Sequence, residues 1–178
     1  MISEARYADI RDLTKTGDLI EFRSPGFIGW CIRKRTGQNV NHTAGVFRLD
    51  NINRLSILES LERGPVPHLL STRLKDFYAI GGVAYWVQLK PQYDEYRNDI
   101  AAAWFDSTTC DKRYDYWSIF MQMFRREEHV DMRRLFCSEM MYAGYIQAKL
   151  PMIPQKYVPR PGEFGATGCF NQSVKILV

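Results

Sequence analysis

The sequence predicts an α+β fold in which an antiparallel β-sheet or open barrel packs against helices. Two observations lead to this fold class. Segments with strand character dominate the first half of the chain, and the longer helical patterns lie in the second half. The intervals between the expected strands are short, which favours antiparallel neighbours over the long crossovers that parallel strands require.

The chain has 178 residues, which is enough for one well-packed domain and short for two. Its 46% apolar and 13% aromatic residues are typical of a folded globule rather than a disordered chain. We expect a single domain over 1–178. Its core would span about 17–150, with an N-terminal arm over 1–16 and a loop-rich tail over 151–178.

The composition also bears on partners and location. The net charge is +4, and arginine pairs at 125–126 and 133–134 could meet phosphates. Such runs usually form a solvated helix face, so we expect no nucleic-acid partner. The N-terminus lacks the apolar core of a secretory peptide, and no stretch approaches the roughly 18 apolar residues of a membrane span. We therefore expect a cytoplasmic protein without a transmembrane segment.

The chain contains four cysteines, Cys31, Cys110, Cys137 and Cys169, without a CxxC pair or regular spacing. This pattern argues against a zinc ribbon and against a dense disulfide framework. Reduced thiols are the default in a cytoplasmic protein, although an even number of cysteines leaves bridges open. We expect neither a metal nor a cofactor.

The N-terminal elements follow from turn and strand signals. Residues up to about 16 are expected to form a short helix or an arm. The stretch "GDLIEF" then indicates a turn at Gly17 and Asp18, followed by a strand over 19–22. In this interpretation Asp18 terminates the turn and fixes the start of the strand.

A short helix should follow this strand. Ser24 is a suitable N-cap, Pro25 suits the first helical position, and Gly37 ends the pattern. One face of this helix carries Phe27, Trp30 and Cys31. We expect Cys31 to be a buried, small apolar residue.

The middle of the chain predicts strands over 43–49 and 55–61. His42 stands at the start of the first strand, and Glu59 lies within the second. A short helix over 71–80, capped at Ser71 or Thr72, comes next. The remaining expected elements are a strand over 82–89, helices over 92–109, 114–129 and 138–150, and a last strand over 174–178.

Cys137 directly precedes the helix over 138–150. The apolar stripe of this helix comprises Met141, Tyr142, Tyr145, Ile146 and the stem of Lys149. Unpaired backbone N–H groups and the positive end of the helix dipole favour a thiolate at such a position, and they can stabilise an oxyanion. The alternative is that Cys137 fills the core beside Phe136. Glu139, in the first turn, is expected to complement the helix dipole.

A thiol nucleophile also needs a base, and a group that orients the base. The chain has three histidines. His129 lies in a charged run and is expected to be exposed, whereas His68 lies in a proline-flanked segment that we interpret as a loop. His42, at the head of an apolar strand, is the histidine that a sheet could hold rigidly. A structural role is the alternative for His42.

Five stretches in a fixed order resemble the circularly permuted NlpC/P60 superfamily, a papain-like group. They are "GDLIEF", "IGWCIRKRTGQ", "NHTAGV", "ILES" and "FCSEMMYAGY". The group includes the YiiX/YebB-like hydrolases and, more distantly, the lecithin:retinol acyltransferase-like proteins. The histidine strand precedes the cysteine helix, which is the permuted order. The resemblance spans about 17–150.

The resemblance implies a papain-like fold with Cys137 as nucleophile at a helix N-terminus and His42 as general base. It also implies that Glu59, in "ILES", is the third residue, which would hold the imidazole in place. Glu59 could instead be a surface carboxylate on an edge strand, and Glu62 is its nearest rival. The acyltransferase-like branch uses a second histidine, for which His68 stands too far along the chain.

The implied activity is that of a cysteine hydrolase, either an amidase or peptidase or an acyl-ester hydrolase, that forms a thioester acyl-enzyme. Its substrate would be a small peptide, another amide or an acyl lipid. The alternative is a catalytically silent NlpC/P60-like module with a binding or structural role, a phage-related one included.

Overall fold

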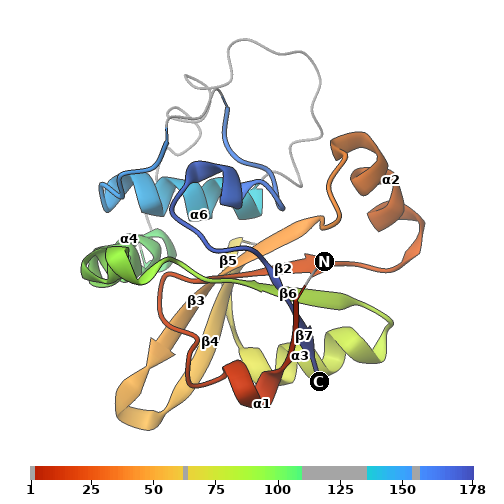
Figure 1. The fold of residues 1–178 in the computed structure, drawn as a ribbon, viewed down its shortest axis with the longest axis horizontal. Coiled ribbons are helices and arrows are strands. Elements are labelled where there is room, and N and C mark those ends of the chain that lie inside the picture. Colours follow the sequence, from red (N-terminus) through yellow and green to blue (C-terminus); the bar gives the residue numbers. More distant parts are fainter. Residues whose placement is uncertain (1–2, 62–63, 110–135, 154–156) are drawn as a thin grey trace.

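The computed structural model describes residues 3–61, 64–109, 136–153 and 157–178 (Figure 1). Its strands are β1 (Ser3–Arg6), β2 (Leu19–Arg23), β3 (His42–Leu49), β4 (Arg54–Leu61), β5 (Gly64–Leu69), β6 (Val83–Val87) and β7 (Val174–Leu177). Its helices are α1 (Tyr7–Ile10), α2 (Gly26–Thr36), α3 (Leu70–Ala79), α4 (Arg97–Thr109) and α6 (Phe136–Gln147). Short 3₁₀ helices are η1 (Asp50–Ile52), η2 (Pro91–Tyr96) and η3 (Phe164–Thr167).

The described strands form one seven-stranded open sheet in the order β1-β7-β6-β2-β3-β4-β5. The mixture of this sheet with helices confirms the α+β class. Figure 1 shows α4 and α6 on one side of the sheet and α3 on the other. The strand pairs from β6 through β2, β3 and β4 to β5 are all antiparallel, as predicted.

One edge of the sheet differs from the prediction. Residues 3–6, expected in a short helix or arm, form β1, which pairs in parallel with β7 and sets Ser3 opposite Val174. The partner of β1 comes from the far end of the chain, so no local pattern indicates the pairing. The sheet is therefore mixed rather than wholly antiparallel.

The other edge also corrects the sequence analysis. The segment that contains Pro65, Pro67 and His68, expected to be a loop, is β5, which pairs with β4. Proline lacks the N–H of a strand residue, but an outer strand tolerates this loss because one of its sides has no partner strand. His68 is consequently held in a strand.

The sheet separates two apolar clusters. Side chains alternate along β2, so Leu19 belongs to the cluster with Trp104 and Met141, whereas Ile20 belongs to the cluster on the other face. On β3, a Cβ added to Gly45 would lie 2.5 Å from the sulfur of Met141. Helix α6 therefore packs on the face to which Gly45 is turned, opposite to the face of its neighbour in the chain, Ala44.

Asp18 does more than terminate the expected turn. Its fully buried carboxylate accepts hydrogen bonds from the backbone N–H groups of Lys15 and Leu89, at 3.0 and 3.1 Å. It also accepts bonds from the Trp86 indole at 2.9 Å and from the Arg97 guanidinium at 2.8 Å. Asp18 thus ties the start of β2 to the end of β6 and to α4.

Helix α2 ends at Thr36, and its C-cap is Gly37, with a left-handed φ of 69°, where the sequence predicts the end of the helix. Its N-cap is Pro25, and no side chain caps it. Phe27 and Trp30 are 75% and 49% exposed, and Cys31 is only half-buried, so the expected burial of Cys31 is wrong. The two rings stack on each other at 5.8 Å instead of packing against the sheet.

The later helices differ from their expected bounds in detail. Helix α3 begins at Leu70, and neither Ser71 nor Thr72 caps it. Helix α6 ends at Gln147 rather than at 150, and Ile146 is 53% exposed although it was expected to be buried. The helix expected over 114–129 lies outside the described residues. In the part of the chain that the structure describes, no helix is long and apolar enough to cross a membrane.

Candidate functional site

Strands β3 and β4 bring His42 and Glu59 together. Gly45 pairs with Leu58, so continuing the register sets Ala44 opposite Glu59 and places His42 diagonally across from it on the same face. The Nε2 atom of His42 lies 2.9 Å from Oε2 of Glu59. The His42 side chain is 17% exposed, whereas that of Glu59 is 0% exposed. Glu59 is therefore a buried residue of an interior strand, not a surface carboxylate. Glu62 lies outside the described residues.

Helix α3 adds a third member, Arg73, to this cluster. Its Nε atom lies 2.6 Å from Oε1 of Glu59, and its Nη2 atom lies 3.0 Å from Oε2. Such a two-point contact fixes the carboxylate plane as well as its charge. The guanidinium also lies 5.3 Å from the ring centroids of both Phe22 and Phe77, within the range of a cation–π contact.

Sequence reasoning did not identify Arg73, although α3 carries a signal that could have found it. Leu70, Leu74 and Phe77 are the buried residues of this helix. Arg73 lies in the same stripe at helical spacing. An arginine within an apolar stripe requires an acidic partner nearby, because a buried charge is costly without one.

The charges of this cluster are coupled. Burial alone would raise the pKa of Glu59, but hydrogen bonds and charge from His42 and Arg73 outweigh burial and hold that pKa at about 2. Glu59 is therefore ionised at neutral pH. A carboxylate at Nε2 fixes the tautomer of the imidazole and stabilises the positive charge that the ring acquires with a second proton. Because Glu59 occupies Nε2, a proton exchanged with a further group would pass through Nδ1.

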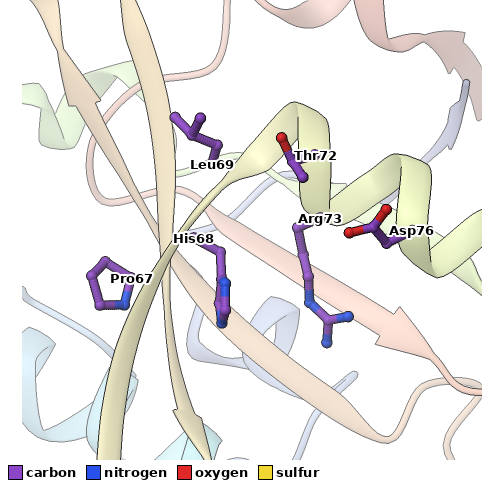
Figure 2. A pocket seen from close by; sticks show the side chains of 6 residues that line it. All are labelled: Pro67, His68, Leu69, Thr72, Arg73 and Asp76. Carbon is purple, nitrogen blue, oxygen red and sulfur yellow. The ribbon is translucent and has the colours of Figure 1, made fainter.

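An open groove of about 450 Å³ adjoins the cluster between β5 and α3. It is lined by Pro67, His68, Leu69, Thr72, Arg73 and Asp76. Figure 2 shows His68 of β5 and Arg73 of α3 extending in the same direction from the two elements. His68 pairs with Ile57 and so shares the sheet face of Glu59. The hydrogen bonds that the described residues give to Glu59 nevertheless come from His42 and Arg73.

Cys137 is the second residue of α6. Its side chain lies outside the described part of the structure, as do Cys110 and His129. One turn after Cys137, Met141 packs on Gly45, on the face of the sheet opposite to that of His42. His42 is the first residue of β3, so the end of this strand is where groups from the two faces can meet.

Glu139 does not have the role that the sequence suggested. Burial raises its pKa to about 8, so at neutral pH it is mainly an uncharged acid and cannot complement the helix dipole. Its Oε1 atom is buried and has no hydrogen-bond partner among the described residues. Among the described cysteines, Cys31 and Cys169 are free thiols. Burial raises the pKa of the Cys169 thiol.

Comparison with known proteins shows that the fold of this chain is similar to that of a solved structure. No family model matches the chain, and no curated protein matches its sequence. Among solved structures, the chain is similar to the metalloprotein YiiX of Escherichia coli O157:H7, with a TM-score of 0.57. The match covers 92% of this chain and 96% of that one, at 15% sequence identity. The likeness supports the YiiX-like resemblance at the level of fold.

Proposed function

We propose that the protein is a cysteine hydrolase that cleaves an amide or ester bond through a thioester acyl-enzyme. Cys137 is the nucleophile, His42 the general base, and Glu59 the residue that orients His42. The observation that carries this proposal is the contact of a buried, ionised carboxylate with a partly exposed imidazole at 2.9 Å. The position of Cys137 in the first turn of α6 and the YiiX-like fold support it.

The proposed reaction has two stages. In the first, the Cys137 thiolate attacks the carbonyl carbon and forms a C–S bond, while the imidazolium of His42 gives its proton to the leaving amine or alcohol as its bond to carbon breaks. In the second, water attacks the thioester and passes a proton to His42. A new C–O bond replaces the C–S bond and releases the acid. Backbone N–H groups at the start of α6 can stabilise the oxyanion in both stages.

The fold limits where the thiol of Cys137 and the imidazole of His42 can meet. Helix α6 packs on one face of the sheet and His42 points to the other. The thiol must therefore meet Nδ1 of His42 around the end of β3. Although the structural neighbour is a metalloprotein, no three His, Cys, Asp or Glu side chains gather as metal ligands within the described ranges.

Alkylation of the native protein tests the proposal. The protein is treated with sub-stoichiometric iodoacetamide between about pH 5 and pH 9, and the labelled cysteine is mapped by mass spectrometry. Cys137 should react first, well below the ordinary thiol pKa of about 8.5. His42→Ala should remove this early reaction, and Glu59→Gln should weaken it. Cys31 and Cys169 are free thiols of the same chain and serve as internal controls.

The same experiment separates the proposal from its alternative. If Cys137 in the folded protein labels no faster than Cys31, or if His42→Ala leaves its pH profile unchanged, the proposed dyad does not exist. The protein would then be a binding or structural module of the same fold. Panels of acyl peptides, acyl lipids and p-nitrophenyl esters would assign the substrate class, with Cys137→Ser as the inactive control.

A further inference from the structure

A second cavity, of about 180 Å³, lies on the other face of the sheet. Glu21 of β2 and Tyr85 of β6 pair directly in the strand register, and both are buried at its base. Glu21 shares its face with Leu19, two residues earlier, which belongs to the apolar cluster of α6. The exposed side chains of Asn39 and Gln172 stand at the mouth. Residues 38–40 and 171–173, which are distant in the sequence, thus line one cavity together with the buried carboxyl group of Glu21.

Glu21 supplies the charge of this cavity. It is only 4% exposed, and its Oε1 atom accepts a hydrogen bond of 2.7 Å from the backbone N–H of Gly162. Burial raises the pKa of Glu21 to about 7, with the Gly162 bond acting against this rise. The described lining contains no lysine, arginine or histidine, so no side chain there neutralises Glu21 when it ionises.

The other polar side chains of the described lining are uncharged: the amides of Gln38, Asn39, Asn171 and Gln172, and the hydroxyls of Tyr85 and Ser173. The side-chain nitrogens of Gln38, Asn39 and Asn171 donate to Glu163, Tyr85 and Gln88, at 3.2, 3.2 and 2.8 Å. Each of these amide nitrogens keeps a second N–H, and the carbonyl oxygens of the amides can accept bonds from a ligand. The cavity therefore presents one carboxyl group and several acceptor oxygens.

We propose that this cavity is a binding site for a small primary amine in its ammonium form. An ammonium group carries a positive charge and three N–H donors and has no acceptor, which complements a carboxylate surrounded by amide oxygens. An anionic ligand would face Glu21 without a neutralising cation. The volume is below the roughly 300 Å³ of sites for drug-sized molecules, so a short alkylammonium is the appropriate size. His42 is not among the described lining residues and lies on the opposite face of the sheet from Glu21, so this proposal does not rest on the proposed hydrolase.

An NMR titration of the full-length, ¹⁵N-labelled protein tests this site, with the backbone amide of Gly162 as reporter. At about pH 7.5, n-butylammonium should shift this signal saturably, whereas n-butyrate should not, and n-butyramide should bind at least about tenfold more weakly. Glu21→Gln keeps an oxygen acceptor for Gly162 but removes the charge, and should weaken n-butylammonium binding at least about tenfold. Asp99→Asn, the same change at an exposed position of α4, should bind as the wild type does.

A pH series on the wild type provides a second measurement that needs no variant. Protonation of Glu21 removes its charge, so binding of n-butylammonium should weaken about 20-fold between about pH 7.5 and pH 5.5. The other titratable groups around Glu21 include Asp18, Tyr85, Tyr145 and Glu163. A pH dependence that persists in Glu21→Gln belongs to those groups and contradicts the proposal.

Two further results would overturn the assignment. One is the absence of a saturable shift at Gly162 with n-butylammonium up to ~50 mM, a concentration at which even a weak ammonium site is occupied. The other is equal binding by the wild type and by Glu21→Gln. If Glu21→Gln fails to fold, as its own NMR spectrum would show, constant affinity of the wild type across the pH series overturns the proposal by itself.

Discussion

Glu59 is a fully buried carboxylate with a partner on each side. Arg73 holds both of its oxygens, and His42 contacts one of them, so the desolvation of the charge is offset by hydrogen bonds from two cation-forming residues. Removing a single partner from such a cluster leaves an uncompensated charge in the interior. The cluster should therefore respond sharply to substitution and to acid.

We expect Glu59→Gln to lower the free energy of unfolding in a pH-dependent manner. The pKa of Glu59 is about 2 in the folded chain, against an ordinary value of 4.5. This difference in pKa contributes about 3 kcal/mol to the free energy of unfolding. The contribution is fully present above the ordinary pKa of the carboxyl group and is lost as the pH falls through about 2. Urea unfolding followed by circular dichroism at about pH 6 should show that the free energy of unfolding of Glu59→Gln is lower than that of the wild type by about this amount.

The difference in the free energy of unfolding between the wild type and Glu59→Gln should decrease as the pH falls from about 4.5 to about 2.5. Glu95→Gln, an exposed substitution in η2, is the matched control and should track the wild type throughout. A gap for Glu59→Gln that stays constant over the whole acid range would show that the carboxylate is not held ionised by its neighbours.

At the residue scale, the sequence indicated His42 and Glu59, which the structure brings into contact, but not the residues around them. His42 and Glu59 could be selected because each falls at a definable position on an apolar strand, and the family resemblance joins them. Arg73 could have been selected only from its place in the apolar stripe of α3, a signal that the sequence analysis did not use. Glu21 could not be selected in this way, because its importance depends on burial against elements far away in the chain, and on its own it resembles an ordinary surface charge.

At the scale of elements, the packing of Trp104 limits how closely α4 and α6 approach each other and the sheet. Trp104 of α4 is fully buried, and it lies against two glycines, Gly45 of β3 and Gly144 of α6. A Cβ added at Gly144 would lie 2.3 Å from the Trp104 ring. The glycine thus allows α6 to pack where the ring would otherwise exclude it.

We expect Gly144→Ala to destabilise the protein by about 1–3 kcal/mol, the usual cost of overpacking a core. This sign is informative, because alanine inside a helix normally stabilises it by about 1 kcal/mol relative to glycine. Thermal unfolding followed by circular dichroism would measure the change. Gly165→Ala in η3 is the control, since an added Cβ there meets nothing within 4 Å. A stabilised Gly144→Ala protein would contradict the packing described above.

The central strands and most helices were predictable because their patterns are local. Periodicity identified the strands that carry His42 and Glu59, and Gly37 marked the end of α2. The outer strands β1 and β5 were not predictable. The first is defined by a partner about 170 residues away, and the second carries prolines that normally argue against a strand. The exposed aromatic face of α2 was missed because periodicity alone does not show what a face packs against.

At the scale of the whole molecule, Glu21 and Glu139 oppose Glu59 in their effect on stability, and the pKa of Asp18, which burial also raises, acts in the same direction. Burial raises the pKa of Glu21 to about 7 and that of Glu139 to about 8. The folded chain therefore holds more protons than the unfolded chain between the ordinary pKa of 4.5 and about 8. Stability should fall as the pH rises through this window and then level off.

Glu139→Gln isolates the larger of these two effects. The variant should be more stable than the wild type by about 2 kcal/mol at about pH 8, after allowance for partial solvent exposure, and nearly equal to it at about pH 5. Urea unfolding at both values, with Asp99→Asn as an exposed control, measures the difference. Parallel stability curves for the wild type and Glu139→Gln would show that Glu139 ionises freely in the folded protein.

The two outer strands carry features that disfavour pairing between the sheet edges of two copies. Strand β5 blocks further pairing with its prolines, and β1 is only four residues long and carries Glu4 and Arg6. Behind β1 lies β7, whose sequence "VKIL" has neither safeguard apart from one lysine. Removal of residues 1–6 would expose the edge of β7, so we expect β1 to protect this edge from pairing with a strand of another molecule.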